Sequence, residues 1–218
     1  MAQRSAKDAR SIDEHDGFSA VLRASSRAAH TRAESEGALT VLLRGDGHLD
    51  LYRNLLVQLS FVYAALEARS EQFREHAVAG AFVFDELTRL DALRHDLDVL
   101  GGPSWFAAAT PLEPTGRYVR RLGQVGPVGF VAHHYTRYLG DLSGGLAVGA
   151  AARRHLGLTN GTSFFTFDAI DNPRQFKDEY RRRLDEAAWS ETERAELVAE
   201  TLLAYRLNTE LQVAVLAA

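Results

Sequence analysis

Residues 135–145 constrain the fold of this 218-residue chain more than any other segment. Their sequence, YTRYLGDLSGG, places three glycines and one acid inside a stretch that otherwise has a helical pattern. Each glycine inside a helix costs about 1 kcal/mol relative to alanine, so a cost of about 3 kcal/mol must be offset. Gly140 and Gly144 are four residues apart and share one helical stripe. We therefore expect a bare backbone surface beside Asp141 that a flat ligand or a second helix approaches closely.

The composition indicates one ordinary globular domain and excludes several kinds of chemistry. The chain has no cysteine, which excludes disulfides, thiolate metal sites, iron–sulfur clusters and cysteine nucleophiles. Its net charge of −4 gives no electrostatic case for a nucleic-acid partner. No apolar run approaches the roughly 18 residues of a membrane span, and the first 16 residues carry no apolar signal segment. We expect a cytoplasmic protein without a membrane anchor.

Hydrophobic periodicity predicts helices and no strands, and therefore an all-α fold. Residues 1–16 are expected to form a flexible extension, and residues 17–218 a single domain. The glycine cluster is expected to interrupt the helix that contains it, and the segment 190–193 reads as the capping box of a last helix. The other expected helices cover about residues 18–35, 49–76, 84–100, 104–109, 114–122, 128–156 and 173–188.

His30 shares one face of the first expected helix with Arg23, Arg27 and Glu34, each within about 60° on a helical wheel. An imidazole with two cations before it and a carboxylate one turn later suits a metal ligand whose cofactor carries anionic groups. Glu34 could then orient the ring. A half-buried histidine beside solvated arginines would give the same pattern, and on this helix alone that arrangement is the more common.

Lys177 and Arg181 are four residues apart on the helix expected after Pro173, so together they could clamp a pair of carboxylates. Runs of arginine such as 181–183 are usually solvated surface. His133 and His134 are adjacent and would point about 100° apart, so we expect them to be structural.

Tyr63, Tyr135 and Arg137 taken singly are more typical of core or surface positions than of catalysis. They become evidence for a functional site only in combination with the other motifs.

Four segments in matching order resemble the haem oxygenases, over about residues 18–215. YTRYLGDLSGG at 135–145 resembles the distal-helix signature of that family, and HTRAE at 30–34 is similar to its proximal-helix motif. QFKDEYR at 175–181 resembles the segment that holds the haem propionates. YRLN at 205–208 resembles the final-helix element beneath the pocket.

The resemblance implies a multi-helix bundle with haem b between a proximal helix and a kinked distal helix. It makes His30 the axial iron ligand, with Glu34 as its hydrogen-bond partner. The remaining roles are a surface of close approach at Gly140 and Gly144, a distal water network at Asp141 with Tyr63 and Arg137, propionate contacts at Arg23, Arg27, Lys177 and Arg181, and further haem contacts at Tyr135, Ser143 and Asn208. The family often has lysine where this chain has Arg23 and Arg27, which changes the geometry of the contact.

The implied reaction is oxidative opening of haem at the α-meso carbon to biliverdin, carbon monoxide and ferrous iron. Haem would be both substrate and cofactor, and O2 the oxidant. We find no glycine-rich dinucleotide fingerprint after a strand, so electrons would come from a ferredoxin or a flavoprotein reductase. We expect a monomer or a weak dimer.

Three other functions are compatible with an all-α fold. A haem carrier or sensor would keep His30 and the cations, but it has no evident need for Asp141 and three glycines. An enzyme of the thiaminase II type uses a cysteine nucleophile, which this chain lacks. A helical interaction module predicts no haem binding and leaves the cost of the glycines unexplained.

Overall fold

The computed structural model describes residues 17–102 and 109–218, and within these ranges the chain is built from helices and loops without a strand. This confirms the all-α prediction. The extension at 1–16 and nearly all of the helix expected at 104–109 lie outside the described residues. The α-helices are α1 (Phe18–Ser35), α2 (Ala38–Arg44), α3 (Leu49–Phe73), α4 (Leu90–Gly101), α6 (Glu113–Gln124), α7 (Pro127–Leu156), α8 (Pro173–Glu186) and α9 (Glu191–Ala217), and the short 3₁₀ helices are η1 (Ala79–Phe82), η2 (Asp85–Leu87) and η3 (Ser163–Phe165).

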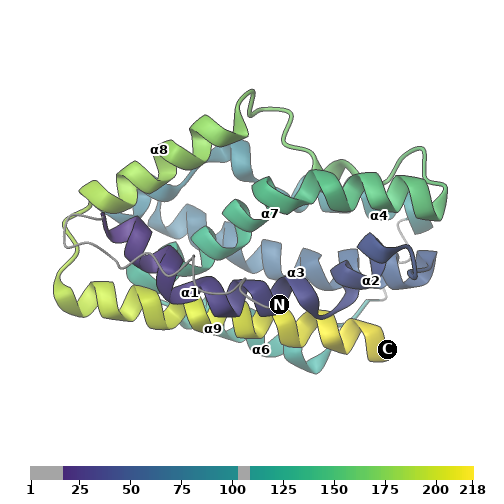
Figure 1. Cartoon of the computed structure of the whole chain (residues 1–218), viewed down its shortest axis with the longest axis horizontal. Coiled ribbons are helices and arrows are strands. Elements are labelled where there is room, and N and C mark those ends of the chain that lie inside the picture. Colours follow the sequence, from purple (N-terminus) through teal and green to yellow (C-terminus); the bar gives the residue numbers. More distant parts are fainter. Residues whose placement is uncertain (1–16, 103–108) are drawn as a thin grey trace, which may run out of the picture.

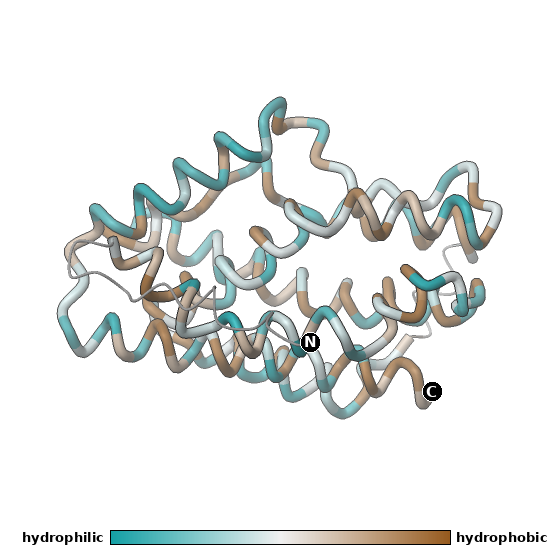
Figure 2. The backbone as a smooth tube through the Cα atoms, viewed as in Figure 1, coloured by the Kyte–Doolittle hydropathy of each residue, from teal (hydrophilic) through white to brown (hydrophobic). Residues whose placement is uncertain are grey.

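The long helix α7 is the centre of the arrangement. It packs against α9, α2 and α3, while α1 lies along α9 (Figure 1). α8 contacts both α1 and α7 and is hydrophilic over most of its length (Figure 2), as expected of a helix at the surface. Asp185 of α8 accepts hydrogen bonds from the backbone N–H of Ser19, at 2.6 Å, and from its hydroxyl, at 3.0 Å, and so fixes the start of α1.

Local sequence signals set two of the helix starts. The side chain of Asn172 accepts a hydrogen bond from the backbone N–H of Gln175, with Pro173 at the first helical position. Ser190 and Glu193 form the reciprocal capping box at the start of α9. The capping box at 190–193 was predicted from the sequence and is confirmed, and the helix expected after Asn172 begins at Pro173 as predicted.

The prediction that the glycine cluster interrupts its helix is wrong, since α7 is helical from Pro127 to Leu156. Glycine keeps its backbone N–H and C=O, so the hydrogen-bond ladder continues through it. Figure 1 shows the axis of α7 changing direction between its two ends. Ser143 lies within the cluster, and its hydroxyl donates to the carbonyl of Leu139 at 2.7 Å, a contact that commonly bends helices.

Two further boundaries differ from the predictions. The helix expected at 84–100 begins only at Leu90, and residues 85–87 form η2 instead. The reason is a distant side chain: Glu67 on α3 accepts hydrogen bonds from the backbone N–H groups of Arg89 and Leu90, at 2.6 and 2.9 Å. α2 was not predicted, and α3 ends at Phe73 rather than near residue 76.

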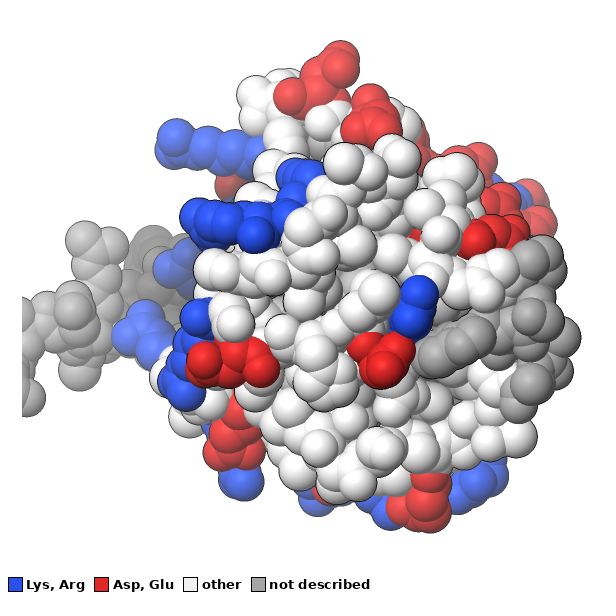
Figure 3. Space-filling model, turned by 90° about the vertical axis from the view of Figure 1, so that its right-hand side faces the viewer, with Lys and Arg blue, Asp and Glu red and all other residues white. Residues whose placement is uncertain are grey.

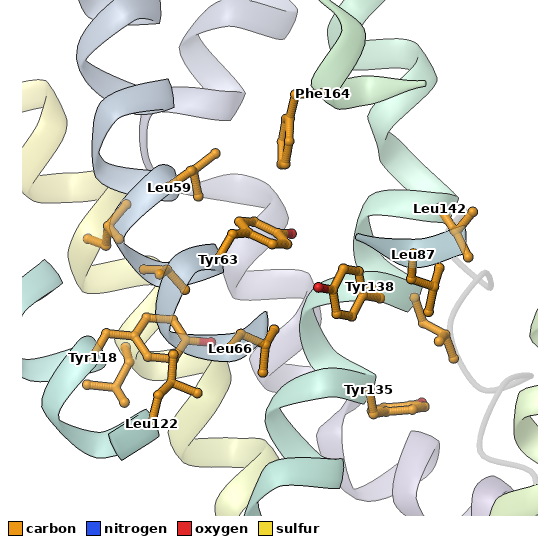
Figure 4. Packing of buried hydrophobic residues seen from close by; sticks show 14 of the residues in the cluster. Leu59, Tyr63, Leu66, Leu87, Tyr118, Leu122, Tyr135, Tyr138, Leu142 and Phe164 are labelled. Carbon is orange, nitrogen blue, oxygen red and sulfur yellow. The ribbon is translucent and has the colours of Figure 1, made fainter. Parts of the chain in front are cut away.

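Large aromatic side chains fill the core where α3, α7 and η3 meet. Tyr63 lies edge-on to both Tyr138 and Phe164, with ring centroids 5.6 and 5.3 Å apart (Figure 4). All three are buried. This packing holds α3 at a fixed distance from α7, behind the cavities described next.

Where Figure 3 shows the described residues, the end of the molecule at the right of Figure 1 is largely uncharged; acidic and basic side chains lie together near its middle, and the other charged side chains lie toward its edge. No helix within the described ranges combines the length and the apolar character that a membrane crossing needs.

Candidate functional site

Two cavities meet between α1, α7 and α9. The smaller has a volume of about 260 Å³ and the larger about 450 Å³. Both are lined by His30, Gly140, Ser143 and Tyr205, so they form the two ends of one continuous site. Every residue that the sequence singled out for this site lines one or both cavities, except Tyr63 and Lys177.

His30 projects from α1 and is 44% exposed. Its Nδ1 lies 3.3 Å from Oε2 of Glu34, one turn later on the same helix. Tyr205 of α9 packs edge-on against the imidazole, with ring centroids 5.7 Å apart. A carboxylate on Nδ1 fixes the orientation of the ring and leaves Nε2 as the nitrogen that can bind a metal.

Glycines of α7 line the same site as His30, and they form two pairs with different surroundings. A Cβ built on Gly140 or Gly144 would meet no atom within 4 Å, so both face open space in the cavity. A Cβ on Gly145 or Gly149 would instead lie 3.4 or 3.0 Å from atoms of Phe165. The first pair gives a flat surface for a ligand, and the second pair lets the loop after α7 pack closely on the helix.

Asp141 lies at the edge of this flat surface and is hydrogen-bonded on its inner side. Tyr63 donates to its carboxylate, and Arg137 Nη2 lies 3.3 Å from Oδ1. Arg137 is itself buried, and it also donates to the Tyr63 hydroxyl, at 3.1 Å from Nη2, and to the side chain of Asn208. A buried guanidinium thus joins α3, α7 and α9 behind the acid.

The surroundings of Asp141 raise its pKa well above the ordinary value, because burial disfavours the charged form. The side chain is still 14% exposed and lines the larger cavity. A carboxyl with a raised pKa that borders a cavity is suited to holding a proton and releasing it there.

Cationic side chains surround the smaller cavity. Arg23 and Arg27 reach it from α1, and Arg181 from α8, with Tyr135 of α7 beside them. Burial raises the pKa of Tyr135, so its hydroxyl stays protonated and can donate. Three guanidinium groups around one opening are suited to binding carboxylates.

Lys177 lies just outside this group. Its ammonium donates to the Ser143 hydroxyl at 3.0 Å, and Ser143 lines both cavities. Lys177 therefore links α8 to the glycine segment of α7 and touches the site through Ser143. Tyr63, the other residue without a place in the cavity lining, is fully buried and reaches the site through Asp141 and Arg137.

His133 and His134 lie away from both cavities, and each has a protein partner. His133 Nε2 is 2.9 Å from Oε1 of Glu200, and His134 Nδ1 is 3.0 Å from the Tyr180 hydroxyl. Burial lowers the pKa of His134 to about 3. Both histidines belong to the packing of α7, in agreement with the sequence argument.

The site also contains residues that sequence reasoning did not single out. Gln212 lines it from α9, on the same helix as Tyr205 and Asn208 of the expected segment at 205–208. The three are spaced three and four residues apart, so their common face could have been found from helical periodicity alone. Phe165, which follows α7, carried no such signal.

The residues of the site match the requirements of a flat, anionic ligand that carries its own metal ion. The described residues contain no cluster of three or more His, Asp or Glu side chains able to hold a metal ion by themselves. One imidazole, a glycine surface with room beside it and a cationic rim do fit a metal brought in by a planar carboxylate ligand. Fold and site thus fit an all-α protein that holds a planar, anionic, metal-carrying ligand between two helices.

The comparisons with known proteins specify this further. The Heme oxygenase family model matches residues 16–213. The chain is 37% identical to a heme oxygenase of Takifugu rubripes, with 83% of this chain and 68% of that protein covered. It is 36% identical to heme oxygenase 2 of Synechocystis, with 87% of this chain and 79% of that protein covered.

Solved structures agree with these matches. The structure of heme oxygenase-1 from Synechocystis in complex with heme superposes with a TM-score of 0.85 at 32% identity, covering 90% of each chain. That of heme oxygenase-2 with heme and NO gives a TM-score of 0.87 at 35% identity, covering 92% of this chain and 85% of the other. This chain therefore belongs to the heme oxygenase family and is an oxidoreductase of the kind that degrades haem.

Proposed function

We propose that this protein cleaves haem to biliverdin, releasing carbon monoxide and ferrous iron, with opening of the ring at the α-meso carbon. One observation carries the proposal. His30 and Asp141 line the same cavity from two different helices, with the bare backbone of Gly140 and Gly144 beside them. A carrier needs the histidine, but a buried proton-holding carboxyl on the opposite wall suits the reduction of O2.

Haem when bound would supply the iron that binds O2 and, as substrate, the porphyrin ring that is opened. His30 would hold the iron through Nε2, and Glu34 would fix the ring of His30 by its contact with Nδ1. Tyr205 packs edge-on against the same imidazole. The contacts with Glu34 and Tyr205 restrict rotation of the His30 imidazole, which would favour one orientation of its bond to the iron.

Asp141 would hold a proton and pass it through water into the larger cavity, where the reduction of O2 consumes protons. Tyr63 and Arg137 would keep the carboxyl at the edge of the cavity, because both bind it from the buried side. Arg137 is in turn held by Asn208. Such a network places the proton at one point in space, which selects the oxygen atom that receives it.

Arg23, Arg27, Arg181 and Tyr135 would bind the propionates at the smaller cavity. Their position at one end of the site fixes the rotation of the porphyrin about its own centre. Lys177 would contribute positive charge beside the smaller cavity, either while bound to Ser143 or by turning its ammonium group toward a propionate. The α-meso selectivity follows from this rotation together with the surface left open at Gly140 and Gly144.

We further propose that electrons are delivered by a ferredoxin or a flavoprotein reductase, and that residues 17–218 act as a monomer or weak dimer in the cytoplasm. The experiment that tests the reaction itself adds haem to the purified protein with ascorbate, or with a ferredoxin and its reductase, in air. Loss of the Soret band with biliverdin and trapped carbon monoxide is the expected result. A Soret band that persists under a working reductant would contradict the proposal and favour a haem carrier, and no Soret shift on adding haem would exclude haem binding altogether.

A further inference from the structure

The wall of the larger cavity beside α7 is formed in part by α2. Leu39, Thr40 and Leu43 of α2 line this cavity, as do Val148 of α7 and Phe165. α2 has only seven residues, and a helix of this length is not stable on its own. Contacts from other elements must therefore set its position, and with it the shape of the wall.

Gln212 of α9 supplies the most specific of these contacts. Its side chain is buried, and its Oε1 accepts a hydrogen bond from the backbone N–H of Leu39 at 3.2 Å. Leu39 is the second residue of α2, where the N–H has no partner within its own helix. Gln212 also lines the larger cavity. One side chain thus binds the start of α2 and borders the site.

The turn before α2 is built around the same side chain. Gly37 has a φ of +93°, and a Cβ at this position would lie 2.5 Å from Cβ of Gln212. The backbone therefore packs directly on Gln212, which only glycine permits here. Thr40 then donates to the backbone carbonyl of Glu34 at 3.0 Å, which joins α2 to the end of the helix that carries His30.

The two ends of the site differ in polarity. Arg23, Arg27 and Arg181 line the smaller cavity. In the larger cavity the charged Arg137 and Asp141 lie on the α7 side, whereas the α2 wall carries Leu39 and Leu43. A porphyrin with its carboxylates at the cationic end would direct its opposite edge, with methyl and vinyl groups, toward α2. The position of α2 would then decide how well that apolar edge fits.

We propose that Gln212 is a positioning residue that sets α2 and thereby the selectivity of the site for the apolar edge of the porphyrin. Because this edge and the propionates together fix the rotation of the ring, Gln212 also contributes to the choice of meso carbon. The inference rests on the proposed function, since it takes haem as the ligand.

The test compares three variants. Gln212→Met keeps the length of the side chain but removes the acceptor, and Gln212→Glu keeps an acceptor. Gln58→Met is a matched control, because Gln58 is also buried and accepts a hydrogen bond from a backbone N–H, that of Leu112 at 2.9 Å, yet lines neither cavity. The readouts are the equilibrium affinities for haem and for deuterohaem, in which hydrogens replace the vinyl groups, and the isomers of biliverdin formed.

We expect the wild type to prefer haem over deuterohaem, and Gln212→Met to lose about tenfold of that preference and to form more of the minor biliverdin isomers. Gln212→Glu and Gln58→Met should keep the wild-type preference, although Gln58→Met lowers the melting temperature. A Gln212→Met protein with the wild-type preference and isomer pattern would overturn the inference alone. A wild type that binds neither porphyrin would overturn the proposed function with it.

Leu43→Ala provides a second route should Gln212→Met fail to fold. Leu43 is 43% exposed and lines the same wall. If the wall formed by α2 meets the apolar edge, this variant also loses preference for haem over deuterohaem. An unchanged preference in Leu43→Ala would overturn the inference.

Discussion

The carboxylate of Asp141 accepts a hydrogen bond from the hydroxyl of Tyr63, a residue 78 positions earlier in the chain. Figure 4 shows the Tyr63 ring projecting from α3 toward the helix that carries Tyr138. Arg137 binds both groups from the buried side. The acid is thus held by two helices, and neither contact depends on a ligand.

Removing the Asp141 carboxyl should separate haem binding from haem cleavage. Asp141→Ala leaves His30 and the cationic rim intact, so haem still binds with a histidine-ligated spectrum. Biliverdin formation should fall by about 100-fold or more, because the proton source is lost. Single-turnover spectra with product analysis measure this. Asp98→Ala, an exposed carboxylate on α4, serves as control, and normal biliverdin formation by Asp141→Ala would remove the acid from the mechanism.

The raised pKa of Asp141 predicts a pH dependence of stability. The folded protein holds this proton more tightly than the unfolded chain, whose aspartate titrates near the ordinary value of 3.8. As the pH rises from about 3.8 toward the pKa in the folded state, the unfolded chain loses the proton first, and the free energy of unfolding falls. Urea unfolding of the haem-free protein should show this decline relative to Asp141→Asn. Parallel curves for the two proteins would contradict it.

His30→Ala should abolish the histidine-ligated spectrum and turnover. Added imidazole should restore both in part, since the cavity left by the side chain can admit a small base. Absorption spectra with and without imidazole measure the effect, and His95→Ala, which is exposed on α4, is the control. A wild-type spectrum in His30→Ala without imidazole would show that another group binds the iron.

Propionate binding by Arg181 predicts a loss of affinity that depends on the ligand carboxylates. Arg181→Ala should weaken binding of haem by about tenfold, which corresponds to the loss of one charge-assisted hydrogen bond. Its affinity for haem dimethyl ester should change little. Arg182→Ala is a matched control, because Arg182 is exposed on the same helix and pairs with Glu179 and Glu186. Equal losses for haem and its ester would refute the assignment.

Two glycines of α7 should respond in opposite ways to alanine. Gly144→Ala adds a Cβ that meets no atom within 4 Å, so we expect a gain of up to about 1 kcal/mol from helix propensity, or about 2–4 °C in Tm. The same Cβ enters the cavity and should weaken haem binding. In Gly129→Ala the Cβ would lie 2.9 Å from Cβ of Val125, which should lower Tm and leave haem binding intact. Thermal melts and haem titrations of both variants test the contrast, and an unchanged haem affinity in Gly144→Ala would contradict close approach of the ligand to α7.

Much of the fold and of the site could be predicted because the signals are local. His30 and Glu34 are one turn apart, so their contact follows from helix geometry. The caps at Asn172 and Ser190 depend on residues within three positions. Gly140 and Gly144 were expected to bare the helix surface, and the structure places both at the cavity.

The helix boundaries and contacts that the sequence did not predict depend on partners far away in the chain. The late start of α4 is due to Glu67, more than 20 positions earlier. The position of α2 depends on Gln212, 173 positions after Leu39. Gly145 had no separate role among the predictions from the sequence, whereas in the structure a Cβ at this position would lie against Phe165. None of these contacts has a periodic signature in the sequence.

The sequence by itself determined the helical class, most of the helices and the residues able to serve a haem site, because periodicity, caps and residue chemistry act over a few positions. Only the tertiary structure decided that Tyr63 and Arg137 bind Asp141 from its buried side, and that Gln212 borders the site. It also decided which glycines meet open space and which meet Phe165. The physical reason is that burial and hydrogen bonding between helices depend on how their faces dock, and docking is settled by packing over the whole chain.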